Sequence, residues 1–113
     1  MHWIPLTTDI QLQQILEQSV TRPQLIFKHS TRCSISSMAK SRLERNYQPS
    51  GIDFHFLDLI AHRALSHEIA DQLNVTHESP QVLLVRNKRC IYHESHTGIS
   101  MDEIVEQSTA AGT

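Results

Sequence analysis

The stretch QLIFKHSTRCSISSMAKSRL, which spans residues 24–43, holds the pattern that decides the fold. Its first five residues, Gln24 to Lys28, include three successive apolar side chains, which is typical of a short strand buried on both faces. A polar turn follows, and the spacing of apolar residues beyond it predicts an amphipathic helix that begins at or beside Cys33. The apolar stripe expected on this helix consists of Ile35, Met38, Ala39 and Leu43. The stretch therefore predicts a βα unit with a cysteine where the helix starts.

Hydrophobic periodicity predicts further elements on both sides of this stretch. Helices are expected over about 9–20 and 62–73 and after residue 100, and strands over about 52–59, 81–85 and 90–92. Residues 3–6 form an edge or lead-in segment, because Pro5 cannot serve a central strand. The expected caps are Thr8 with Gln11, Ser100 with Glu103, and Asn74 in the left-handed conformation, and the tail from Ala110 to Thr113 is expected to fray. This order predicts an α/β fold with a mixed central sheet and helices on both faces.

Length and composition narrow the function classes. A chain of 113 residues, 39% of them hydrophobic, matches one compact domain over residues 1–113. The formal charge of -2 offers no general attraction for nucleic acid or for an anionic membrane. No apolar run approaches the roughly 20 residues of a membrane span, and the amino terminus carries no secretory pattern. We therefore expect a cytoplasmic protein without nucleic-acid or membrane partners.

Cys33 stands where backbone amides are unpaired and the helix dipole is positive. Both stabilise a thiolate, and Arg32 adds a neighbouring positive charge, so we expect a lowered pKa for Cys33 and a nucleophilic role. The alternative is a small buried apolar residue, but the polar neighbours Ser30 and Ser34 favour an exposed turn. Ser36 completes a C-x-x-C frame in which a hydroxyl replaces the second thiol. That hydroxyl can donate a hydrogen bond to the Cys33 sulfur but cannot attack a disulfide, which predicts a monothiol enzyme.

The second cysteine, Cys90, is expected to be a free and half-buried structural thiol in its strand. The spacings Cys90-x-x-His93 and His93-x-x-His96 occur in zinc sites. Residues three apart on a strand point to opposite sides, however, so Cys90 and His93 cannot act as a close pair of ligands. We therefore predict no metal site.

The position of Ser79-Pro80 before a strand, with Cys33 after the first buried strand, resembles the thioredoxin fold, whose members carry a cis proline that faces the active cysteine. Over nearly its whole length the chain is similar to the bacillithiol system YtxJ family, the monothiol bacilliredoxins. The blocks that carry this resemblance are Trp3-Ile4-Pro5-Leu6, residues 27–31, residues 33–36, residues 77–81, Ser95-His96 and Ile99-Ser100. The active segment usual in that family is Thr-Cys-Pro-Ile-Ser, whereas this chain has Arg32 before Cys33 and Ser34 after it. Ser34 in place of proline restores an amide donor and leaves the loop less rigid.

The resemblance implies a thiol-disulfide oxidoreductase that removes bacillithiol, or a similar small thiol, from protein mixed disulfides. It implies Cys33 and Ser36 as catalytic residues and Thr31, Arg32, Ser34, Ile35, Ser79 and Pro80 as substrate-binding residues. Arg32 can pair with a carboxylate of the malate group of bacillithiol. The expected partners are bacillithiol as co-substrate and bacillithiolated client proteins, with no tightly bound cofactor and a monomer or weak dimer. Two alternatives stay open: an iron-sulfur cluster carrier of monothiol glutaredoxin type, and a thioredoxin-like binding module without turnover.

Overall fold

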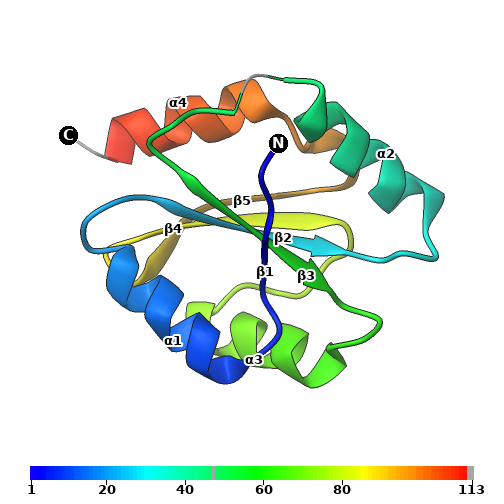
Figure 1. Ribbon diagram of the computed structural model, residues 1–113, viewed down its shortest axis with the longest axis horizontal. Coiled ribbons are helices and arrows are strands. Elements are labelled where there is room, and N and C mark those ends of the chain that lie inside the picture. The colour runs from blue at the N-terminus through cyan, green and yellow to red at the C-terminus, as the bar shows by residue number, and fades with distance from the viewer. Residues whose placement is uncertain (47, 112–113) are drawn as a thin grey trace.

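The computed structural model describes residues 1–46 and 48–111. In chain order the elements are β1 (Ile4–Pro5), α1 (Asp9–Gln18), β2 (Gln24–His29), α2 (Ser34–Glu44), β3 (Asp53–Asp58), α3 (Arg63–Leu73), β4 (Gln81–Arg86), β5 (Arg89–Ser95), the short 3-10 helix η1 (His96–Gly98) and α4 (Met101–Ala111). Figure 1 shows α1 and α3 on one face of the sheet and α2 and α4 on the other. The predicted α/β fold with helices on both faces is confirmed.

The five strands form one mixed sheet in the order β1-β3-β2-β4-β5. β2 lies at its centre, parallel to β3 and antiparallel to β4, and all six of its residues are buried, as the apolar run predicted. β1 pairs with β3 through Ile4 and Pro5 alone, which places the proline on an edge strand. Consecutive β2 side chains enter opposite cores: Ile26 packs in the α1 and α3 layer, and Phe27 in the α2 and α4 layer.

Short capping motifs in the sequence predicted several helix ends correctly. The Thr8 and Gln11 capping box is present, and Asn74 is left-handed with φ 55. The Glu103 amide donates to Ser100 Oγ at 3.2 Å, but the Glu103 carboxylate accepts from Gln107 instead of completing a capping box. The last helix continues through Ala111 instead of fraying at Ala110, and residues 112 and 113 lie outside the described part of the chain.

The final hairpin is longer than predicted. The turn consists of two residues, Asn87 with φ 55 and Lys88 with φ 65, whereas the predicted strands 81–85 and 90–92 left four residues between them. Two left-handed residues match a type I′ turn, whose twist suits the twist of the flanking strands. Because the turn is tight, pairing begins at Arg86 and Arg89, and β5 runs on to Ser95.

The apolar stripe predicted for α2 is wrong at two of its four positions. Ala39 and Leu43 are fully buried, whereas Ile35 is 47% and Met38 62% exposed. Ser36 faces the sheet in their place and has no exposed surface. A buried hydroxyl is tolerated when it has hydrogen-bond partners, and Ser36 has two. The helix therefore leaves an apolar surface beside Cys33 open to solvent.

Candidate active site

Cys33 is the N-cap residue of α2, directly beyond the carboxyl end of β2. Its thiol is free and half-buried. The backbone holds it on both sides, because the Cys33 amide donates to the Ser30 carbonyl at 3.2 Å and its carbonyl accepts from the Ser37 amide at 3.1 Å. The cysteine thus lies at the positive end of an 11-residue helix, as the sequence predicted.

Ser36 lies under the cysteine loop but is turned toward β2. Its Oγ accepts from the Ser30 amide at 3.0 Å and lies 2.6 Å from His29 Nδ1, with which it shares a hydrogen bond. The hydrogen bond expected from Ser36 to the Cys33 sulfur is not formed, and no other residue of the described chain hydrogen-bonds that sulfur. The Ser36 hydroxyl therefore connects the first turn of α2 to the end of β2.

His29 also lies in the site, although from the sequence it was only one member of the block of residues 27–31 that resembles the family. It is 5% exposed, with its ring 5.7 Å from that of Phe27 and 5.3 Å from that of Phe56. Burial lowers its pKa below the ordinary value of 6.5, and the charge of Lys40 lowers it further, against weaker opposite effects. The imidazole is therefore neutral at pH 7. The signal that could have found it is a polar residue at the end of a buried strand, followed by a serine in the first helical turn.

The Ser79-Pro80 loop meets the cysteine loop at the same end of the sheet. Lys28 of β2 pairs with Gln81 of β4 in the antiparallel register, so Pro80 lies across from the strand end that leads to Cys33. The Ser79-Pro80 bond is cis, which confirms the expectation from the resemblance. Pro80 is buried and its carbonyl accepts from the His96 amide at 3.1 Å. Within the described residues, Ser79 Oγ is buried without a partner.

Lys28 ties this loop to β2 from the other face of the sheet, a role the sequence did not reveal. Its ammonium group is fully buried, donates to the Ser66 carbonyl at 3.1 Å and lies 3.2 Å from His77 Nδ1. Burial lowers the pKa of Lys28 to about 8. Burial, followed by the charges of Lys28 and His67, also lowers the pKa of His77. Because His77 precedes Ser79 by two residues, this cluster anchors the start of the Ser79-Pro80 loop.

The remaining predicted substrate-binding residues surround the thiol at the surface. Thr31, Arg32, Ser34 and Ile35 are all exposed. Ile35 and Met38 together form an apolar rim along the first turns of α2. Beyond Met38, the helix borders an open hollow of 340 Å³ lined by Ser37, Met38, Ser41, Arg42 and Arg45. The site therefore offers apolar contacts and positive charge next to the cysteine.

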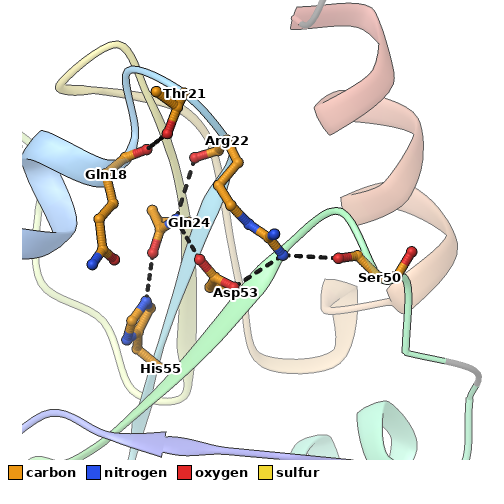
Figure 2. A network of polar contacts seen from close by, with 7 residues as sticks. All are labelled: Gln18, Thr21, Arg22, Gln24, Ser50, Asp53 and His55. Atoms are coloured by element: carbon orange, nitrogen blue, oxygen red, sulfur yellow. Dashed lines mark hydrogen bonds and ion pairs between the residues drawn. The ribbon is translucent and has the colours of Figure 1, made fainter.

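A second polar network marks the opposite end of β2 (Figure 2). Gln24 donates to the Asp53 carboxylate at 2.8 Å, and its carbonyl oxygen lies 2.7 Å from His55 Nε2. Arg22 forms an ion pair with Asp53 at 3.0 Å and donates to the Ser50 carbonyl at 2.8 Å. His55 is 5% exposed, like His29, and burial lowers its pKa to about 4. This network fastens β2 to β3 away from the cysteine.

Cys90 is half-buried in β5 and packs against the core of the α1 and α3 layer, on the other face of the sheet from α2. Its thiol donates to the Tyr92 carbonyl at 3.3 Å, and burial raises its pKa to about 11. Across residues 1–46 and 48–111, no three His, Cys, Asp or Glu side chains lie close enough together to hold a metal ion. In the same part of the chain, no helix has the length and hydropathy needed to cross a membrane.

The geometry agrees with what known proteins show. A solved structure described as a candidate oxidoreductase with a thioredoxin fold superposes with a TM-score of 0.81 at 28% identity, covering 92% of this chain and 91% of its own. Thioredoxin from Malassezia sympodialis gives 0.74 at 14% identity, covering 96% and 97%, and thioredoxin f from spinach chloroplast gives 0.69 at 14%, covering 96% and 92%. The latter two show the fold alone. The model of the family "Monothiol bacilliredoxin BrxC" matches residues 4–104, which confirms the resemblance and gives the chain a role of thiol oxidoreductase type. The chain belongs to the monothiol bacilliredoxin BrxC family.

Proposed function

We propose that the chain removes bacillithiol, or a closely similar small thiol, from mixed disulfides on client proteins through Cys33. The observation that carries this proposal is the environment of the Cys33 thiol. Cys33 is the N-cap residue of α2, and Ser36 occupies the position of a second cysteine. Cys90 packs in the opposite layer, so no resolving thiol accompanies Cys33. A single accessible thiolate can take up a small thiol but needs an external partner to release it.

The first half of the cycle is an exchange of one disulfide for another. The Cys33 thiolate attacks the bacillithiol sulfur of the client mixed disulfide. A new bond forms between Cys33 Sγ and that sulfur, while the old disulfide bond breaks. The client cysteine leaves as a thiolate with the bonding electron pair and takes a proton from water. No net oxidation occurs, because one disulfide replaces another.

The second half returns Cys33 to its starting state. A thiolate from a second bacillithiol molecule or from a separate redoxin attacks the bacillithiol sulfur held on Cys33. Cys33 leaves as a thiolate, and the new disulfide carries the bacillithiol away. Ser36 cannot perform this step, because a hydroxyl is not a disulfide nucleophile at neutral pH.

The neighbouring groups are suited to hold such a substrate. Ser79 would pair its backbone with the extended chain next to the disulfide. Pro80 would cover the reacting sulfur. Arg32 is exposed and would bind a malate carboxylate of bacillithiol. We further propose a monomer or weak dimer that acts in the cytoplasm without a tightly bound cofactor.

Intact-mass spectrometry tests this function directly. The reduced protein is mixed with a peptide that carries a bacillithiol mixed disulfide or a glutathione mixed disulfide. We expect a bacillithiol-sized adduct on wild type and on Cys90→Ser, with the peptide released as a free thiol, and no adduct on Cys33→Ala. Arg32→Ala should slow the bacillithiol reaction more than the glutathione reaction. Absence of any adduct on wild type would refute the proposal.

A further inference from the structure

The Ser36 hydroxyl has one proton and more than one place to direct it. The Ser30 amide already donates to Ser36 Oγ at 3.0 Å, which uses one lone pair of the oxygen. His29 Nδ1 lies 2.6 Å from the same oxygen, and which of the two atoms donates depends on whether Nδ1 carries a proton. The direction of the Ser36 proton is thus controlled by His29.

The two states of His29 have opposite consequences for Cys33. In the neutral tautomer that the relay requires, the ring proton is on Nε2, so Nδ1 accepts a hydrogen bond from Ser36 and the hydroxyl points away from the cysteine. When Nδ1 is protonated, it donates to Ser36 Oγ, as the Ser30 amide already does. The Ser36 hydroxyl then no longer donates to His29, and its proton can point elsewhere. Cys33 is the N-cap and Ser36 lies three residues further along the helix, a spacing that brings side chains together on one helix face. The sulfur is not hydrogen-bonded to Ser36 in the structure, but an N-cap side chain lies near residue N3, so a Cys33 thiolate that rotates about its Cα–Cβ bond would be the acceptor for the freed hydroxyl.

We propose that His29 is a positioning residue that, on protonation at Nδ1, turns the Ser36 hydroxyl from the imidazole to the Cys33 sulfur and so stabilises Cys33 as a thiolate. The hydrogen bond also favours the moment at which Cys33 leaves from its own mixed disulfide, because a thiolate is released there. This inference rests on the proposed thiol exchange at Cys33. It assigns His29 a part in the reaction without contact between His29 and the substrate.

The surroundings of His29 favour the neutral state until the thiolate appears. The charged groups that act on it are Lys40 and Glu44 from α2 and Asp58 from β3. Lys40 and Glu44 form an ion pair at 3.0 Å, which offsets part of the Lys40 charge. Burial and Lys40 keep the pKa of His29 below its ordinary value. Coupling between two sites is reciprocal. A Cys33 thiolate that accepts a hydrogen bond from Ser36 therefore favours protonation of His29 in return.

The test is the pH dependence of Cys33 alkylation by iodoacetamide, measured on the Cys33 peptide from pH 5 to pH 9 and scaled to the rate at pH 9. A hydrogen bond to an anion changes the thiolate fraction about tenfold. The bound thiolate is less nucleophilic, with a Brønsted slope of about 0.5, so the rate changes about threefold. In wild type we expect the rate to fall less steeply than tenfold per pH unit where His29 titrates, so that the rate lies about threefold above a single-ionisation curve once His29 is protonated.

Three variants separate the relay from other effects. His29→Asn keeps a hydrogen-bonding group beside Ser36 but cannot titrate there, and Ser36→Ala keeps His29 and its charge but removes the hydroxyl. Both should follow a single-ionisation curve. His55→Gln changes the equally buried histidine at the other end of β2 and should keep the wild-type profile.

Two results would overturn the inference. One is a single-ionisation curve in wild type. The other is a wild-type profile in Ser36→Ala, which would mean that the His29 charge acts on Cys33 directly. Since Ser36→Ala leaves the imidazole in place, it decides the question even where His29→Asn does not fold. Alkylation needs no bacillithiol, so this test and the adduct test of the proposed function fail or succeed separately.

Discussion

Replacing Lys28 by methionine is expected to stabilise the chain at neutral pH and to remove part of its pH dependence. The ammonium group of Lys28 has no exposed surface, and burial lowers its pKa from 10.5 to about 8. At 1.36 kcal/mol per pKa unit, this difference corresponds to about 3 kcal/mol for keeping the group charged in the folded state at pH 7. The lost contacts to the Ser66 carbonyl and to His77 offset about 1 to 2 kcal/mol of that. Lys28→Met should therefore be more stable than wild type by about 1 to 2 kcal/mol at pH 7.

The sign of the pH dependence follows from the lowered pKa. Between pH 8 and pH 10.5 the unfolded chain holds the Lys28 proton while the folded chain has released it. The free energy of unfolding therefore rises with pH in this range for wild type but not, through this group, for Lys28→Met. Cys90 acts in the opposite sense, since its pKa rises from 9.0 to about 11 on folding, so both proteins should carry Cys90→Ser. The advantage of Lys28→Met should disappear between about pH 9 and pH 9.5 and be reversed at pH 10.

Urea unfolding followed by the fluorescence of Trp3 measures this difference. Trp3 is the only tryptophan and stacks on Phe27 at 5.5 Å, so its emission reports on the core. Midpoints are compared at pH 7, 8, 9 and 10 for wild type, Lys28→Met and Lys88→Asn, a variant that removes an exposed lysine from the hairpin turn. Lys88→Asn should follow wild type at every pH. A stability difference between Lys28→Met and wild type that is the same at pH 7 and pH 10 would refute the reasoning.

Three further variants test other parts of the structure. Cys90→Ser should leave the labelling of Cys33 by iodoacetamide at pH 8 unchanged, because a pKa of about 11 keeps the Cys90 thiol protonated; peptide mapping of wild type that finds Cys90 labelled as fast as Cys33 would contradict it. Met38→Glu should slow reduction of a peptide mixed disulfide about fivefold, the effect of losing about 1 kcal/mol of apolar contact, without changing iodoacetamide alkylation. Ile10→Glu, on the opposite layer and 68% exposed, is its control, and equal slowing by both would count against the apolar rim. Thr8→Ala should lower the free energy of unfolding by about 1 kcal/mol, and an unchanged urea midpoint would show that the capping box contributes nothing.

The parts of the fold that sequence predicted well are those set by neighbours along the chain. The apolar run from Gln24 to Lys28 identifies β2 because a strand buried on both faces needs no alternation. The N-cap position of Cys33 follows from the polar turn before an amphipathic helix. Thr8 and Asn74 fulfil their capping roles because the partners of a cap lie within a few residues.

The features that the sequence did not predict depend on partners that are distant in the chain, or on a competition between apolar and hydrogen-bonded polar side chains for a buried position. Hydrophobic spacing placed Ile35 and Met38 in the core, but it could not weigh the two hydrogen bonds that make burial of Ser36 favourable. A lysine inside an apolar strand is a visible anomaly, yet its partner His77 is 49 residues away and only the β2–β4 register brings the two together. The bond predicted from Ser36 to Cys33 is wrong, because the Ser36 hydroxyl is hydrogen-bonded to His29 and the Ser30 amide instead.

The alternation of side chains along β2 explains how one strand end can position both halves of the site. Lys28 points into the α1 and α3 layer, where it holds His77 and so the start of the Ser79-Pro80 loop. His29, the next residue, points into the α2 layer and holds Ser36, which clamps the loop that carries Cys33. Consecutive strand residues must face opposite sides of the sheet, so these two clamps cannot rotate independently. A change of register at this strand end would therefore move the nucleophile and the substrate loop together, and the two are fixed by neighbouring residues although they come from segments far apart in the chain.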